Sequence, residues 1–208
     1  MPVAARPKRT RFAPAERRAQ LVACAISAFA EHGLARATHS HVAERAGISV
    51  PAVHSYFRTR EDLVVAVLDA VETELREMHA DTLNAPGTVH HCLNALAVRF
   101  VAEARDKPDL IKVWLDWSTG VRADIWPRYV SLNDWFTAQA RLVLTRGQRE
   151  GVVPMQLNAK AAAALFIGGG HTVALMQFSG ASERDFDIFV AQLISMVMGL
   201  GVSGDRNK

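Results

Sequence analysis

The sequence predicts an all-α protein in which a three-helix segment near the N-terminus precedes a larger helical region. Apolar residues recur every three or four positions along most of the chain, and glycines and prolines separate the periodic segments. No segment shows sustained strand alternation. Half of the 208 residues are hydrophobic and 22% are charged, so the chain has enough apolar side chains for a sizeable core.

The helical pattern begins after a basic segment, residues 1–13, which has no hydrophobic period and is expected to form a flexible arm. Pro14 suits the first turn of a helix, which Gly33 ends as a C-cap glycine. A second, short helix follows Thr38 and is broken by Gly47. The pattern therefore predicts two helices and a glycine turn that leads into a third.

Ser49 suits the N-cap of this third helix, residues 50–56, and Pro51 is tolerated because it falls in the first turn. Thr59 and Asp62 have the spacing of a capping box that opens a fourth helix. Later periodic segments predict five more helices, at about residues 93–101, 110–117, 126–150, 159–178 and 183–199. The expected domain bounds are 1–13 for the arm, 14–60 for the three-helix domain and 61–208 for the helical remainder.

The charges are distributed unevenly along the chain, whose net charge is +3. Residues 1–60 carry ten lysines and arginines and three acidic residues, whereas residues 61–208 carry fourteen basic and eighteen acidic residues. A basic head on a mildly acidic body indicates a polyanionic partner for the head alone.

The three short helices have the organisation of a helix-turn-helix unit. The small Ala43 lets two helices cross closely, and Gly47 makes the turn. The helix after the turn exposes short polar side chains, which are the kind that reach base edges in the major groove. The expected DNA contacts are Ser49, Ala52, His54 and Ser55 to bases, and Tyr56, Thr59 and Arg60 to phosphates.

Three sequence blocks resemble the DNA-binding domain of the TetR family of transcriptional regulators, with the family's spacing kept between them. The blocks are residues 29–33, 42–49 and 56–63. A narrower resemblance, to the LuxR/HapR/SmcR subgroup of quorum-sensing master regulators of vibrios, is carried by Arg9-Thr10-Arg11, residues 112–118 and Trp126-Pro127. The resemblance implies a homodimeric, sequence-specific transcriptional regulator that binds a pseudo-palindromic DNA operator.

The subgroup resemblance also implies that Arg9 and Arg11 enter the minor groove. A flexible cationic arm is drawn to narrow, A·T-rich minor grooves. The alternative is that the arm is a solvated tail. The third helix departs from the subgroup, because residues 51–55 read Pro-Ala-Val-His-Ser where those proteins tend to have Ala-Thr-Val-Phe-Asn. Asparagine can pair bidentately with adenine and Ser55 cannot, so we expect a different DNA site.

A ligand site is predicted in the C-terminal region. Asn133 interrupts a mostly apolar helix face, and a buried amide needs hydrogen-bond partners. It either bonds a neighbouring helix or lines a cavity, and the subgroup resemblance implies a cavity. The candidate contacts to a small apolar ligand are Trp114, Trp117, Asn133, Thr137 and His171, the last of which follows a run of three glycines.

The last two predicted helices are apolar and rich in small residues. Two such helices from each of two chains would pack as a four-helix bundle, which would make the dimer; the alternative is that they belong to the core of one chain. The candidate interface residues are Leu165, Phe166, Phe186, Phe189, Val190, Leu193, Ile194 and Val197.

Other classes of protein find little support. No histidine or cysteine group has metal-ligand spacing, and no nucleophile elbow or phosphate-binding loop occurs, so we expect neither an enzyme nor a cofactor or metal. Cys24 and Cys92 do not indicate a disulfide framework. Uninterrupted apolar runs are too short for a membrane span and no secretory signal is seen, so the expected location is cytoplasmic. A ligand-binding or protein-interaction module with a degenerate DNA-reading head remains the alternative function.

Overall fold

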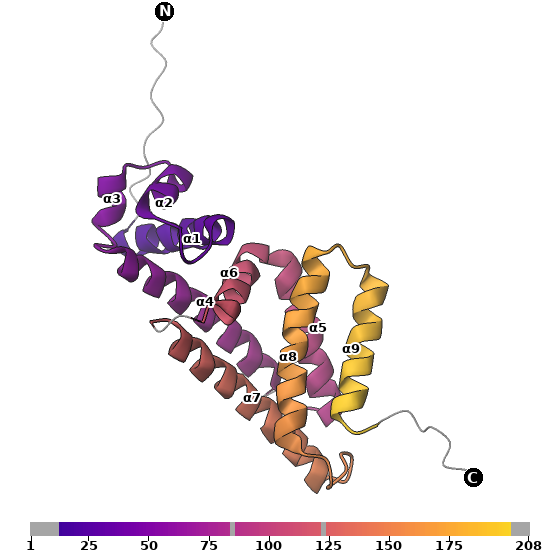
Figure 1. The fold of residues 1–208 in the computed structure, drawn as a ribbon. Helices are drawn as coiled ribbons and strands as arrows, with labels where there is room; N and C mark the ends of the chain where they lie inside the picture. The colour runs from indigo at the N-terminus through magenta and orange to yellow at the C-terminus, as the bar shows by residue number, and fades with distance from the viewer. Residues whose placement is uncertain (1–12, 84–85, 122–123, 201–208) are drawn as a thin grey trace, which may run out of the picture. The chain divides into compact units, whose positions relative to one another are not determined.

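The computed structural model describes residues 13–83, 86–121 and 124–200, and within these ranges the chain forms nine α-helices and no strand (Figure 1). The all-α prediction is confirmed. Contacts divide the chain into residues 1–68 and 69–208, here called the N-terminal and C-terminal units. The division falls inside a helix, after Leu68, whereas the sequence placed the boundary at residue 60. The arm residues Arg9 and Arg11 lie outside the described residues.

The N-terminal unit contains α1 (Pro14–His32), α2 (His39–Ala46), α3 (Val50–His54) and the beginning of α4 (Arg60–Leu83). Helix α2 contacts both α1 and α3. Each helix turns its apolar stripe inward, because a stripe at helical spacing must be buried against another element. Buried core residues of this unit include Leu21, Ala25, Phe29, Leu34, Val42, Val53, Phe57 and Leu63.

The turn between α2 and α3 depends on Gly47, which has a φ of 63°. This left-handed conformation suits glycine, and it lets the N–H of Ile48 donate to the carbonyl of Ala43 at 3.0 Å. Ser49 occupies the N-cap of α3, although its side chain makes no capping hydrogen bond. Helix α3 ends at His54, two residues earlier than expected, because residues 55 and 56 already turn toward α4.

The C-terminal unit contains the rest of α4 and five further helices in the described ranges (Figure 1). They are α5 (Val89–Asp106), α6 (Pro108–Thr119), α7 (Trp126–Arg149), α8 (Ala159–Phe178) and α9 (Glu183–Val197). Helix α8 contacts α5, α6, α7 and α9. It is therefore the central packing element of this unit.

By length and composition alone, α8 is long and apolar enough to cross a membrane, although the sequence analysis expected no membrane span. The structure accounts for part of its apolarity, since Phe166 and Val173 are buried against the neighbouring helices. Leu165 and Leu175, in contrast, are each 62% exposed. Helix α8 is thus apolar both toward its own unit and on its outer face.

Candidate nucleic-acid interface and ligand cavity

Helix α3 presents polar atoms outward from an apolar anchor. Val53 is fully buried, whereas His54 and Ser55 are exposed and Ala52 is half-buried. The hydroxyl of Ser55 donates to the carbonyl of Ala52 at 2.7 Å. Since its hydrogen is used, Ser55 offers lone pairs outward and can accept a hydrogen bond from a base or from water.

His54 is held by contacts within the N-terminal unit. Its ring stacks on that of the buried His39, with 3.9 Å between the ring centroids. Its Nδ1 lies 3.2 Å from the carbonyl oxygen of Arg58, and Nε2 of His39 lies 2.8 Å from that of Phe57. Because a carbonyl oxygen can only accept, Nδ1 of His54 and Nε2 of His39 each carry a hydrogen. Nε2 is therefore the ring nitrogen with which neutral His54 can accept a hydrogen bond.

The expected phosphate-binding residues at the start of α4 are held in place by hydrogen bonds. The Thr59 hydroxyl accepts from the N–H of Asp62 at 3.0 Å, and the Asp62 carboxylate accepts from the N–H of Thr59 at 3.0 Å. This is the predicted capping box. Arg60 donates from Nε to the carbonyl of Ala37 at 3.0 Å and from Nη2 to that of Leu34. Two of its donors therefore serve the fold rather than a phosphate.

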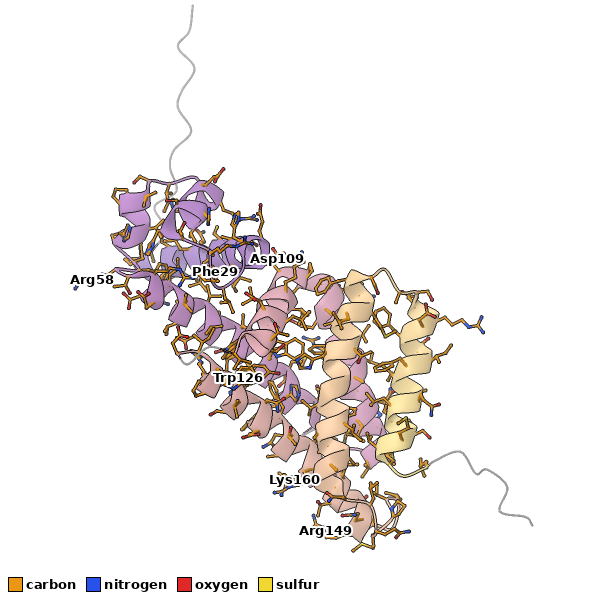
Figure 2. All side chains as sticks on the ribbon, viewed as in Figure 1. Phe29, Arg58, Asp109, Trp126, Arg149 and Lys160 are labelled. Carbon is orange, nitrogen blue, oxygen red and sulfur yellow. The ribbon has the colours of Figure 1, made fainter. Side chains whose placement is uncertain are left out.

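Arg58 is a candidate DNA contact that the sequence reasoning missed. It is exposed, and its guanidinium has no hydrogen-bond or ion-pair partner within the part of the chain that the structure describes. Figure 2 shows its side chain extending away from the N-terminal unit. Its position in the block at residues 56–63 was the available indication, but a sequence cannot tell an exposed arginine from one used internally, as Arg60 is.

A cavity of about 50 Å³ lies within the C-terminal unit. Its walls are apolar and aromatic, and they come from all six helices of that unit. They are formed by Leu75, His79, Leu96, Ala97, Phe100, Trp114, Phe136, Phe166, Ile167, Gly169, Gly170, Val173, Val190 and Leu193. Of the five residues predicted to contact a ligand, Trp114 belongs to this wall.

His171 contacts the cavity-wall residue Trp114, whereas Trp117 does not line the cavity. The His171 ring centroid is 4.3 Å from that of Trp114, and its Nε2 is 3.2 Å from the hydroxyl of Tyr129. Burial lowers the pKa of His171. Trp117 is fully buried and its indole N–H donates to the carbonyl of Ile125 at 3.0 Å, which indicates a structural role.

Asn133 and Thr137 are half-buried on α7 and do not line the cavity. Sequence reasoning instead missed His79, Phe100, Phe136 and Phe166, which come from four different helices. His79 lies four residues after Leu75, on the apolar stripe of α4, and that spacing was the available indication.

A charged cluster joins α4 to α7. Arg128 lies 2.7 Å from a carboxylate oxygen of Asp69 and 2.8 Å from one of Glu72, and its guanidinium lies 5.6 Å from the Trp117 ring centroid. Partial burial tends to raise the pKa of Glu72, but hydrogen bonds from Arg128 and Arg76 hold that pKa below its usual value. The cluster therefore fixes α4 against α7 while Glu72 is ionised.

The residues expected to form a dimer interface divide into two groups. Five are buried within the C-terminal unit, so their apolarity is explained by one chain: Phe166, Phe186, Val190, Ile194 and Val197. Leu165 is exposed, and Phe189 and Leu193 are half-buried. These three line an outer groove of α8 and α9 together with Ala161, Ala164, Gly168, Gly169 and Thr172.

Gly169 and Leu193 line both the internal cavity and this outer groove. A Cβ atom at Gly169 would overlap Cδ2 of Leu193, so the glycine permits α9 to approach α8 closely. One layer of side chain therefore separates the cavity from the outer apolar surface.

The chain is similar to known bacterial regulators. The family described as "Bacterial regulatory proteins, tetR family" matches residues 21–67. The HTH-type transcriptional regulator LuxR of Vibrio harveyi is 28% identical over 195 residues, which cover 94% of this chain and 95% of that protein.

Solved structures share the fold. A TetR transcriptional regulator from Chloroflexus aurantiacus superposes with a TM-score of 0.76 at 19% identity, covering 88% of this chain and 94% of that one. The regulator FadR from Bacillus subtilis, in complex with stearoyl-CoA, superposes with a TM-score of 0.67 at 19% identity, covering 90% and 99%.

Substitution of Arg58 and of Arg60 distinguishes an exposed arginine from one that stabilises the fold. Arg60→Ala removes two charge-assisted hydrogen bonds to backbone carbonyls, so we expect it to destabilise the N-terminal unit by about 1.5–3 kcal/mol. Arg58→Ala removes an exposed side chain, and its stability should stay within about 0.5 kcal/mol of wild type. Chemical denaturation followed by circular dichroism measures both. Equal stability of the two variants would contradict the structural role of Arg60.

Proposed function

We propose that the chain is a transcriptional regulator of the TetR type that binds DNA sequence-specifically as a homodimer on a pseudo-palindromic operator. One short helix contacts too few base pairs for a specific site, whereas two such helices related by a two-fold axis double that number. The main support for the proposal is the geometry of helix α3: Val53 is buried in the core, and His54 and Ser55 are exposed.

The proposed contacts follow from the geometry of the N-terminal unit. His54 and Ser55 offer acceptors, which pair with the exocyclic amino groups of adenine or cytosine, and Ala52 suits a thymine methyl group. Ser49, Tyr56 and Thr59 supply hydroxyls next to them, and Arg58 adds a free cation for phosphate. We expect Arg60 to support this surface by positioning the start of α4, rather than by binding a phosphate with all its donors.

Selection of binding sequences from random duplex DNA, with the full-length protein near physiological salt, tests the proposal. Enrichment of an imperfect palindrome of about 20 base pairs with half-sites about one helical turn apart is expected. Folded protein that enriches no motif would contradict it. That result would favour the alternative, a ligand-binding or protein-interaction module whose DNA-reading head is degenerate.

The arm is proposed to enter the minor groove through Arg9 and Arg11. The double variant Arg9→Ala/Arg11→Ala should weaken binding mainly at A·T-rich flanks and lower the salt slope by about one to two units. Arg58→Ala serves as a comparison, because loss of one phosphate contact should lower the slope by about one unit without changing the flank preference. Fluorescence anisotropy over a salt series measures both effects. An unchanged slope and footprint in the double variant would leave the arm as a solvated tail.

The outer apolar groove of α8 and α9 is the proposed dimer interface. Leu165 and Leu175 on α8 are exposed, as are Ile188 and Met196 on α9, at 58% and 57%. Exposed apolar side chains on two neighbouring helices, together with an apolar groove between them, are typical of an interaction site. Two copies of α8 and α9 meeting face to face would bury it in a four-helix bundle.

Leu165→Glu is expected to convert the dimer to monomer at micromolar concentration, because it would bury a carboxylate in the bundle. Sedimentation velocity measures the change. Leu142→Glu is the matched control, since Leu142 is 58% exposed on α7, away from this groove. Because Leu165 is itself 62% exposed, the monomer's stability should change by no more than about 0.5 kcal/mol. A dimer that persists in Leu165→Glu would exclude this surface.

A small ligand in the cavity of the C-terminal unit is proposed to modulate DNA binding. FadR from Bacillus subtilis, which shares the fold, was solved with stearoyl-CoA bound. In this chain the cavity wall includes α4, the helix that begins with Arg60, and the layer of Gly169 and Leu193 next to the outer groove. A ligand that favours one arrangement of these elements would shift the population of DNA-binding dimers. The proposed location of the protein is the cytoplasm, where bacterial DNA lies.

A further inference from the structure

The cavity of the C-terminal unit contains one polar side chain with an unused hydrogen-bonding atom. His79 is 6% exposed, and its Nε2 has no partner among the residues that the structure describes. Its ring stacks on Phe136, with the centroids 4.0 Å apart. Buried polar atoms are nearly always paired, so an orphaned atom in a cavity wall indicates something that is bound there.

The hydrogen bond on the other side of the ring defines what Nε2 can bind. Nδ1 of His79 lies 3.0 Å from the carbonyl oxygen of Leu75. Since a carbonyl can only accept, Nδ1 carries the ring hydrogen, and Nε2 of the neutral ring presents a lone pair. The cavity therefore presents a hydrogen-bond acceptor, Nε2 of His79, to which a ligand N–H or O–H group can donate.

Burial keeps this ring neutral. It lowers the pKa of His79 to about 4, whereas the hydrogen bond to Leu75 acts weakly in the opposite direction. At pH 7 protonation is thus disfavoured by about a thousandfold. An anionic carboxylate, which only accepts, would face the lone pair of Nε2 and would have to overcome that penalty.

The rest of the wall selects an apolar body. Phe100, Trp114, Phe136 and Phe166 contribute aromatic surface. Gly170 leaves space beside two of them, because a Cβ atom there would be in ordinary van der Waals contact with the rings of Phe100, at 3.6 Å, and Trp114, at 3.8 Å. Among the described residues that line the cavity, His79 is alone in having a side-chain acceptor of this kind.

We propose that this cavity binds a neutral, mainly apolar molecule that donates one hydrogen bond to Nε2 of His79, such as an alcohol, a phenol or an N–H heterocycle. The inference rests on the proposed ligand-binding role of the C-terminal unit and names the class of ligand. At about 50 Å³ the cavity is smaller than the roughly 150 Å³ that holds a benzene ring, so an aromatic ligand would have to displace Leu193 toward the outer groove.

Three probes of equal size test the proposal on the full-length protein: benzyl alcohol, which donates, anisole, which only accepts, and ethylbenzene, which does neither. Affinity is measured by ligand-observed NMR and by the fluorescence of Trp114 and its neighbours. Benzyl alcohol should bind about three- to tenfold more tightly than either of the other probes. In ¹⁵N-labelled protein, the Nε2 resonance of His79 should shift with benzyl alcohol alone.

His79→Phe should abolish the preference, so that benzyl alcohol and ethylbenzene bind equally well. This variant removes an unpaired buried acceptor and keeps a ring against Phe136, so it is expected to fold. His90→Phe is the matched control, because His90 is exposed at the start of α5, and it should retain the wild-type preference. The ¹⁵N measurement on wild-type protein keeps the test independent of any variant's folding.

Two outcomes would overturn the inference, and they differ in what else they exclude. Equal affinity for the three probes, with no shift of the His79 resonance, would show that the cavity binds ligands without a hydrogen bond to His79. Failure of every probe to bind folded protein would also remove the proposed ligand role of this unit. DNA affinity, measured separately without probes, reports on the regulator itself and would be unaffected by either result.

Discussion

The hydrogen bonds of Arg60 are the constraint on which the N-terminal unit depends. They join the first turn of α4 to the carbonyls of Leu34 and Ala37, in the segment between α1 and α2. Leu34 and Ala37 are themselves buried, so their carbonyls have little access to water. By donating to them, the guanidinium ties the segment that precedes α2 to the start of α4, and α2 leads into the glycine turn and α3.

Helix α4 is shared by the two units and links their roles. Its first residues complete the core of the N-terminal unit, while Asp69 and Glu72 bind Arg128 and His79 lines the cavity in the C-terminal unit. A ligand in the proposed cavity site would contact α4 through Leu75 and His79. The contacts that change when a ligand binds must favour one state over another for regulation to follow.

The two arginines near residue 60 show why the candidate site could be predicted only in part. The spacing of sequence blocks located the DNA-binding helices, and the capping box of Thr59 and Asp62 is present as expected. Yet Arg60, predicted to bind phosphate, donates inward, and Arg58, which was passed over, is exposed. Residue type gives the charge of a side chain, but burial and available carbonyls decide where that charge is used.

The amino-acid sequence by itself determined the helices, their breaks and the location of the DNA-binding unit, because helical periodicity, caps and the left-handed glycine at residue 47 act over a few neighbouring positions. Only the tertiary structure decided the membership of the cavity and of the outer groove. His79, Phe100 and Phe136 come from separate helices, and the orphaned Nε2 of His79 exists only because those helices close around it. Such groupings depend on packing between distant segments, which no local pattern specifies.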